Sequence, residues 1–228
     1  MPVPAEGLLL VDKPAGVTSH DVVQLARKEY GERSIGHLGT LDPFATGLLI
    51  LLLGRFTRLA TFIETEPKIY DATICFGAET DTDDSTGTVV RESPIPSPAA
   101  IRNAIPNLTG RIEQVPPDYS AKSVGGMRAY DAAREGAPLV LAPVTVEVAG
   151  WTLRAERDAE IDVTIECGSG TYIRSLARDM GRLTGSAAHL SALRRTRAGD
   201  FHVRDAVTLD QIINDHPPLR RLRVVTDD

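Results

Sequence analysis

The sequence predicts an α+β fold, and three observations favour this class. Residues 160–167 alternate between apolar and polar side chains, which is the pattern of a half-buried strand in an antiparallel sheet. Residues 173–180 place apolar side chains at the spacing of one helix face. Strand-like and helix-like segments follow one another without regular βαβ alternation, so a doubly wound α/β fold is not expected.

The composition is that of a globular protein, with 228 residues, 42% hydrophobic and 25% charged. The longest apolar run, residues 48–53, is far shorter than the roughly 18 residues that a membrane-spanning helix needs. No secretion signal opens the chain, and the two cysteines lie too far apart to indicate a zinc site or a disulfide framework. We therefore expect a cytoplasmic protein with no membrane contact and no metal.

The net charge of −6 argues mildly against a nucleic-acid partner, but its distribution is uneven. Residues 64–92 contain eight acids and two bases, whereas residues 172–204 contain seven arginines and two acids. A folded chain can present the basic segment on one face while the acids lie elsewhere. A polyanionic partner therefore remains open.

In the first part of the chain, residues 7–11 predict a short apolar strand and residues 12–16 a turn. Thr18 and Asp21 have the spacing of a capping box and predict a helix that ends at Gly31. Residues 36–47 are rich in Gly, Thr and Pro and predict a loop. The apolar run from residue 48 is a buried strand or a buried helix segment, and periodicity does not decide between them.

Further along, Ser97 and Pro98 predict a short helix that ends at Pro106. The helix that follows Gly170 carries an arginine at every fourth position on a face other than its apolar one: Arg174, Arg178 and Arg182. Thr208 and Gln211 form a second possible capping box and predict a terminal helix.

Asp42 is the candidate for chemistry in the loop of residues 36–47. Pro43 disfavours the helical conformation for the preceding residue, so Asp42 is held in an extended or turn conformation. In one interpretation Asp42 caps a following helix. In the other it is a carboxylate on a rigid loop near His37, placed to act as a nucleophile or base.

The string of residues 36–47, GHLGTLDPFATG, resembles the motif of the TruB-type tRNA pseudouridine synthases. Four further blocks agree with this family in order and spacing, and the resemblance covers about residues 7–210. The blocks are residues 12–19, residues 68–70 with 80–83, residues 119–122 with 130 and 133–134, and residues 168–174 with 193–195.

The resemblance implies a pseudouridine-synthase fold, with a mixed, mainly antiparallel sheet flanked by helices. The catalytic domain would span residues 1–207, with an RNA-binding thumb loop inserted at about residues 117–143. Residues 208–228 would form a short C-terminal helix and tail. Many relatives continue into a small PUA-type RNA-binding domain, so this chain resembles a short form.

The resemblance also implies a reaction, the isomerisation of uridine 55 in the T-arm of tRNA to pseudouridine. The base is flipped out of the T-loop, its N1–C1′ bond breaks, the uracil rotates, and C5 bonds to C1′. Such an isomerisation needs no cofactor. The expected partner is the T-arm stem-loop of tRNA, with no obligate protein partner. The acidic residues 80–84 match no calcium motif, and in the family they form a turn.

Residue by residue, the resemblance makes Asp42 the participating carboxylate. Tyr70 would stack on the target base, and Arg174 would pair with the catalytic aspartate. Without the resemblance, Tyr70 is an ordinary strand aromatic and Arg174 a solvated helix residue.

Three more residues belong to this expected active site. Tyr172 and Leu193 would line the pocket, and His37 would fill the space that the extruded base leaves. By their positions alone, Tyr172 and Leu193 would be core residues and His37 a loop-packing residue.

The expected RNA contacts come from the thumb loop and from the arginines after residue 172, because bases interleaved with aromatic residues suit phosphate contact and stacking. The block around Lys13 is expected to support the active-site loop rather than to react. The RNA-binding candidates are Lys13, Lys122, Arg128, Tyr130, Arg134, Arg178, Arg194 and Arg195.

Two other functions compete with the isomerase. A non-catalytic tRNA-binding or tRNA-folding module could keep the surface without the chemistry, although the joint presence of Asp42, Tyr70 and Arg174 speaks against it. A carboxylate-dependent hydrolase would need a second carboxylate as the acid, and no motif supplies one beside Asp42.

Overall fold

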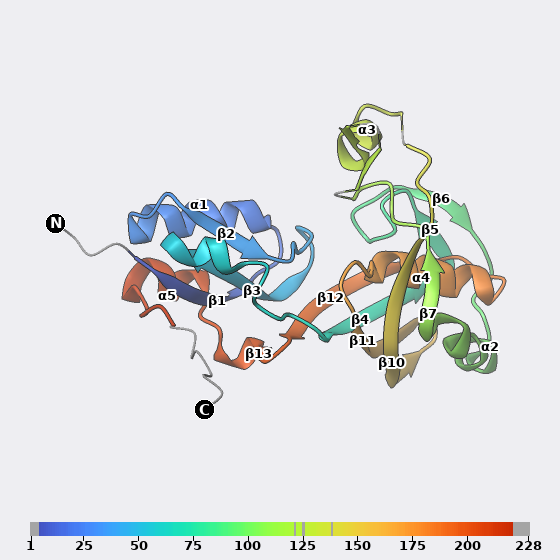
Figure 1. Cartoon of the computed structure of the whole chain (residues 1–228). Helices are drawn as coiled ribbons and strands as arrows, with labels where there is room; N and C mark the ends of the chain where they lie inside the picture. Colours follow the sequence, from blue (N-terminus) through green and yellow to red (C-terminus); the bar gives the residue numbers. More distant parts are fainter. Residues whose placement is uncertain (1–4, 121, 125, 138, 221–228) are drawn as a thin grey trace. The chain divides into compact units, whose positions relative to one another are not determined.

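The computed structural model describes residues 5–120, 122–124, 126–137 and 139–220, and only the backbone of residues 123, 124, 128, 130 and 131. The chain divides into two compact units (Figure 1). Unit 1 comprises Met1–Lys68 and Arg194–Asp228, and unit 2 comprises Ile69–Leu193. The predicted division into residues 1–207 and 208–228 stays a prediction, and residues 221–228 lie outside the described residues.

Unit 1 is built on β3, which pairs antiparallel with β1 and with β2 and, at its first residues, parallel with β12. Strand β13 extends this sheet from β12. The elements are β1 (Gly7–Lys13), α1 (Ser19–Tyr30), β2 (Ile35–Leu38), β3 (Thr46–Leu53), η1 (Gly54–Leu59), β12 (Ala188–Ala198), β13 (Phe201–His202), η3 (Val203–Asp205) and α5 (Leu209–Asp215). Strand β12 begins in unit 2 and ends in unit 1.

The apolar run from residue 48 is a strand because β3 is buried on both faces. Leu49, Leu51 and Leu53 face one hydrophobic cluster, which also contains side chains of α1 and α5. The alternate residues of β3 face a second cluster on the other side of the sheet. Burial on both faces removes the polar alternation that identifies a strand, which is why periodicity could not decide.

The predicted capping signals are confirmed. The Thr18 hydroxyl accepts a hydrogen bond from the Asp21 amide, the Asp21 carboxylate accepts one from the Thr18 amide, and α1 ends at Gly31 in the left-handed conformation. Thr208 and Gln211 cap α5 in the same reciprocal way. The expected loop of residues 36–47 is shorter than predicted, because its ends belong to β2 and β3.

Unit 2 contains a sheet in the order β12-β4-β11-β10-β7. Its other elements are helices and short hairpins. They are β4 (Lys68–Phe76), β5 (Ala78–Thr80), β6 (Val89–Glu92), α2 (Pro98–Ala104), η2 (Ile105–Leu108), β7 (Gly110–Gln114), β8 (Ser123–Val124), β9 (Met127–Arg128), α3 (Ala129–Arg134), β10 (Val144–Arg157), β11 (Glu160–Cys167) and α4 (Ile173–Leu183).

The sequence patterns of unit 2 are largely confirmed. Strand β11 alternates between buried and half-buried residues along its whole length and pairs antiparallel with β10. Helix α4 buries all four predicted apolar positions, Ile173, Leu176, Ala177 and Met180. Helix α2 begins at Pro98 as predicted, but Pro106 lies within the following turn of η2 and does not end the helical segment. No helix in the described part of the chain is long and apolar enough to span a membrane.

Gly47 is required by the close approach of β12 to β3, and its replacement tests that contact. Gly47 has φ +99°, and a Cβ there would overlap the carbonyl oxygen of Arg195. We expect Gly47→Ala to lower the free energy of unfolding by about 3 kcal/mol, because backbone strain adds to overpacking. Urea denaturation measures this difference.

Gly31→Ala is the matched control, because Gly31 has φ +62° and nothing lies within 4 Å of its missing Cβ. It should cost only the strain, about 1–2 kcal/mol. Equal losses in the two variants would contradict the importance of the close approach.

Candidate functional site

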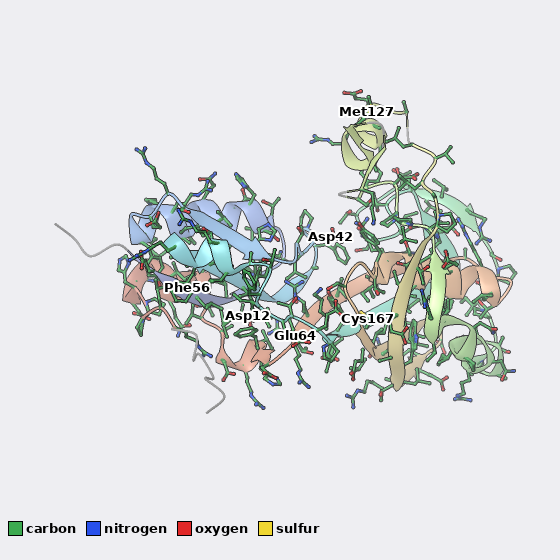
Figure 2. All side chains as sticks on the ribbon, viewed as in Figure 1. Asp12, Asp42, Phe56, Glu64, Met127 and Cys167 are labelled. Carbon is green, nitrogen blue, oxygen red and sulfur yellow. The ribbon has the colours of Figure 1, made fainter. Side chains whose placement is uncertain are left out.

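Asp42 lies in unit 1 on the loop between β2 and β3 and is half-buried (Figure 2). No helix follows it, because the chain turns at residues 43–44 and enters β3. The interpretation of Asp42 as a helix cap is therefore wrong. We call residues 39–48, which are this loop and the first three residues of β3, the Asp42 loop.

The residue before Asp42 is held by a buried hydroxyl group. Ser19 Oγ donates a hydrogen bond to the carbonyl oxygen of Leu41 (3.0 Å) and accepts one from its amide (2.9 Å). Ser19 is the first residue of α1 and is buried. One side chain thus satisfies both backbone groups of Leu41, as a neighbouring strand would.

The residue after Asp42 is held by a buried lysine and a backbone amide. Lys13 Nζ donates to the carbonyl oxygens of Val17 (2.7 Å), Pro14 (2.9 Å) and Pro43 (3.3 Å). The Gly16 amide also donates to Pro43 O, at 2.8 Å. Burial lowers the pKa of Lys13 to about 8, although the negative charges of Asp42 and Asp21 oppose this shift.

The ends of the Asp42 loop are held by Arg195. Its Nε donates to Leu48 O (2.8 Å) and its Nη2 to Gly39 O (2.9 Å). The side chain is fully buried. Ser19 on α1, Lys13 on β1 and Arg195 on β12 therefore fix the Asp42 loop.

His37 is the last but one residue of β2, close to the start of this loop, and is half-buried. Burial lowers its pKa, and the positive charge of Arg195 and the proximity of His20 lower it further. The imidazole is therefore neutral at pH 7. Among the described residues its Nδ1 atom is buried without a hydrogen-bond partner.

In unit 2, Gln114 fixes the segment that begins α4. The Gln114 side chain accepts a hydrogen bond from the Tyr172 amide (2.8 Å) and donates one to the Tyr172 carbonyl (3.1 Å). Tyr172 is the N-cap residue of α4 and is half-buried. Tyr70 on β4 and Leu193 on β12 are buried, with 7% and 8% exposed surface.

Arg174 is buried, so the interpretation as a solvated helix residue is wrong. Its Nη1 and Nη2 donate to the carbonyl oxygens of Thr82 and Tyr119, both at 2.8 Å. Its Nε lies 3.8 Å from a carboxylate oxygen of Asp84. Its expected pairing with Asp42 stays a prediction.

The acidic segment does not lie apart from the arginines of α4, which corrects the expected separation of charge. Arg178 Nη1 donates to Asp83 Oδ2 at 2.8 Å, and Arg182 forms an ion pair with Glu79. Burial raises the pKa of Asp83 to about 6, although Arg178 and Arg174 oppose the shift. Burial also raises the pKa of Glu79, but hydrogen bonds from Arg182 and Arg91 outweigh it and the net shift is downward.

Asp84 stabilises the turn that presents these acids. Its Oδ1 accepts hydrogen bonds from the Thr82 hydroxyl (2.8 Å) and from the Thr86 amide (2.9 Å) and hydroxyl (2.5 Å). No group of side chains that could hold a metal ion occurs among the described residues.

Burial corrects part of the expected RNA-binding set. Lys13, Arg178 and Arg195 are buried and donate to acceptors of the protein itself, so phosphate contact by them is not supported. Arg194 forms an ion pair with Asp12 and keeps 40% of its side chain exposed.

In the predicted thumb loop, β8 and β9 form a hairpin that leads into α3. Lys122 is half-buried and Arg134 is exposed. The side chains of Arg128 and Tyr130 lie outside the described residues.

Sequence reasoning missed the role of Ser19 and Gln114. Each binds both backbone groups of one residue, across 22 and 58 positions of the chain. Ser19 lies within the family-like block of residues 12–19, which was a signal that it matters but not for what. We find no local signal for Gln114.

With this geometry in view, comparison with known proteins identifies the class as a pseudouridine synthase. The family model "TruB family pseudouridylate synthase (N terminal domain)" matches residues 27–173, and "tRNA pseudouridylate synthase B C-terminal domain" matches residues 174–222. The curated relatives include a tRNA pseudouridine synthase B from Arthrobacter sp. (strain FB24), 46% identical over 217 residues, which are 92% of this chain and 71% of that protein. Another, from Thermobifida fusca (strain YX), is 45% identical over 218 residues, which are 91% of this chain and 74% of that protein. The chain belongs to the TruB family and is a tRNA pseudouridine synthase, an isomerase that forms pseudouridine in tRNA.

Solved structures confirm the pseudouridine-synthase fold. A chain of a Cbf5-Nop10-Gar1 complex superposes with a TM-score of 0.72 at 27% identity. A chain of an H/ACA RNP bound to a substrate RNA containing 2′-deoxyuridine gives 0.68 at 26%. Each match covers 92% of this chain but only about half of the solved chain, 54% and 53%.

The raised pKa of Asp83 predicts a pH-dependent stability. The folded protein binds this proton more tightly than the unfolded chain, so ionisation of Asp83 lowers the free energy of unfolding as the pH rises from 3.8 to about 6. Asp83→Asn removes the titration. As the pH rises through this range, the free energy of unfolding of the parent should therefore fall relative to that of D83N, by on the order of 2 kcal/mol.

Urea denaturation of parent and variant between pH 4 and pH 7 measures this difference. A difference that stays constant with pH would show that burial does not hold the proton on Asp83.

Proposed function

We propose that this enzyme isomerises uridine 55 in the T-arm of tRNA and that Asp42 is the reacting carboxylate. The observation that carries the proposal is the anchoring of the residues on both sides of Asp42, Leu41 by Ser19 and Pro43 by Lys13 and Gly16. A catalytic group gains rate when its supporting residues hold it in one orientation. The half-buried carboxylate on this loop fits that requirement.

The proposed reaction breaks the N1–C1′ bond, rotates the uracil and joins C5 to C1′, with the proton on C5 passing to N1. Atoms and charge balance within the nucleotide, so no co-reactant is consumed. The Asp42 carboxylate either attacks the nucleoside or stabilises the sugar cation, and both roles need an anion at a fixed position.

The supporting roles follow the family pattern. Tyr70 stacks on the target base, Tyr172 and Leu193 line the pocket, and Arg174 orients the catalytic carboxylate. The two hydrogen bonds between the Gln114 side chain and the Tyr172 backbone support a fixed position for Tyr172 in the pocket wall. The neutral, flat imidazole of His37 suits the space left by a base flipped out of the T-loop.

The RNA contacts are proposed to come from the thumb loop and from Arg194. Three other basic candidates, Lys13, Arg178 and Arg195, are buried, which supports an RNA-binding face that makes few phosphate contacts. The expected cytoplasmic location and the absence of an obligate protein partner stay predictions.

Asp42→Asn tests the reacting group. The variant should bind tRNA as the parent does, because the amide has the same size, but its turnover should fall by at least about 100-fold. Mass-spectrometric mapping of pseudouridine in an unmodified tRNA transcript measures the product and its position. The matched control is Asp210→Asn, which changes an exposed acid of the same unit and should keep full turnover.

Substantial turnover by D42N would remove Asp42 as the reacting group. Product at a position other than 55, or continued turnover of a transcript with cytidine at position 55, would remove the proposed target.

The thumb loop is tested by the salt dependence of binding. Each phosphate contact contributes about 0.7–0.9 to the slope of log affinity against log salt. The double variant Lys122→Ala/Arg134→Ala should bind tRNA more weakly and reduce the magnitude of this slope by about 1.5. Arg102→Ala is the control. Arg102 on α2 forms an ion pair with Glu156 on β10 and lies outside the thumb loop, so its replacement should leave the slope unchanged. An unchanged slope in the double variant would remove the thumb loop from the RNA-binding face.

A further inference from the structure

Arg195 makes contacts at both ends of the Asp42 loop. Its guanidinium joins the carbonyl oxygens of Gly39 and Leu48, nine positions apart in the chain. Its backbone pairs with Gly47 across the parallel β3–β12 contact. The loop therefore starts and ends against one residue of a distant strand.

The shape of the guanidinium group suits this position. Its donors are held in a rigid planar fork, so Nε and Nη2 can reach two separate carbonyl groups at once. At 1% exposure the side chain has no surface to offer to an RNA phosphate. Nη1 lies 3.1 Å from the place where a Cβ on Gly39 would be, so the loop backbone is packed directly against the guanidinium.

We propose that Arg195 is the positioning residue of the Asp42 loop: it closes the loop at Gly39 and Leu48 so that the carboxylate of Asp42 has one orientation, and it binds no RNA. The inference rests on the proposed role of Asp42. It adds a function for a residue that the sequence placed among the RNA contacts.

Arg195→Lys is the decisive variant, because lysine keeps the charge but cannot hold both carbonyl groups with a planar fork. We expect kcat for pseudouridine formation to fall about 10- to 100-fold, since a displacement of about 1 Å costs this much. The affinity for tRNA and its salt dependence should stay within twofold of the parent. Arg197→Lys is the control on the same strand, since Arg197 donates to Gly199 O and not to the Asp42 loop.

Amide hydrogen exchange gives a readout that does not depend on activity. The amide of Ala45, which donates to Asp42 O, and that of Gly16, which donates to Pro43 O, should exchange faster in R195K. The amides of α1 should keep their parental rates. Faster exchange throughout unit 1 would indicate a general structural role and overturn the proposal.

Gly39→Ala provides a second test if R195K does not fold. This variant keeps Arg195, but the added methyl group displaces the guanidinium. Gly31→Ala is its control, because Gly31 has a similar backbone conformation (φ +62°, against +77° for Gly39) and no atom near its missing Cβ. We expect G39A, but not G31A, to lower kcat without a change in tRNA affinity.

The outcomes separate the two proposals. Parental kcat in R195K together with an inactive D42N would overturn the role of Arg195 alone. A salt slope reduced by about one phosphate contact in R195K would make Arg195 an RNA ligand and overturn it as well. Turnover by D42N would instead overturn the proposed function.

Discussion

Buried cationic groups need acceptors, and this requirement organises both units of the protein. Lys13, Arg174, Arg178 and Arg195 are all buried, and a buried cation without partners would cost several kcal/mol. In unit 1 the acceptors that satisfy Lys13 and Arg195 are backbone carbonyl groups, most of them in or next to the Asp42 loop. In unit 2 they include carboxylates of the acidic turn. The hydrogen bonds and ion pairs of these four cations therefore hold the Asp42 loop and the acidic turn in place.

Because of this pairing, the net charge of −6 does not tell which charged side chains the protein can present to a polyanion. The arginines of α4 neutralise acids of their own unit, Arg178 with Asp83 and Arg182 with Glu79. Charge counted by segment therefore overstated both the acidic and the basic surface. The RNA contacts proposed above, from the thumb loop and Arg194, lie outside this cluster, and a small number of them would suit binding that depends more on the shape of the RNA than on total charge.

The parts of the fold that sequence predicted are those with local causes. The Thr18–Asp21 capping box and the alternation of β11 act within a few residues, and both are confirmed. Burial of β3 on both faces removed the alternation of apolar and polar residues that identifies a strand. The sequence also did not separate β2 from the loop that follows it. The family motif placed Asp42 on a loop, but the contacts that hold the loop come from distant residues such as Ser19. Such contacts leave no periodic trace in the sequence.

The anchoring of the Asp42 loop uses side chains on one side and backbone atoms on the other. Ser19, Lys13 and Arg195 bind carbonyl and amide groups of Leu41, Pro43, Gly39 and Leu48. Backbone acceptors are present whatever side chains the loop carries, so the orientation of Asp42 depends on the anchoring residues more than on the identity of its neighbours. Ser19 lies on α1, Lys13 on β1 and Arg195 on β12. Strands β1 and β12 both pair with β3, and the ion pair between Arg194 and Asp12 joins them directly. The geometry of the proposed reacting carboxylate is therefore set by the packing of unit 1 as a whole.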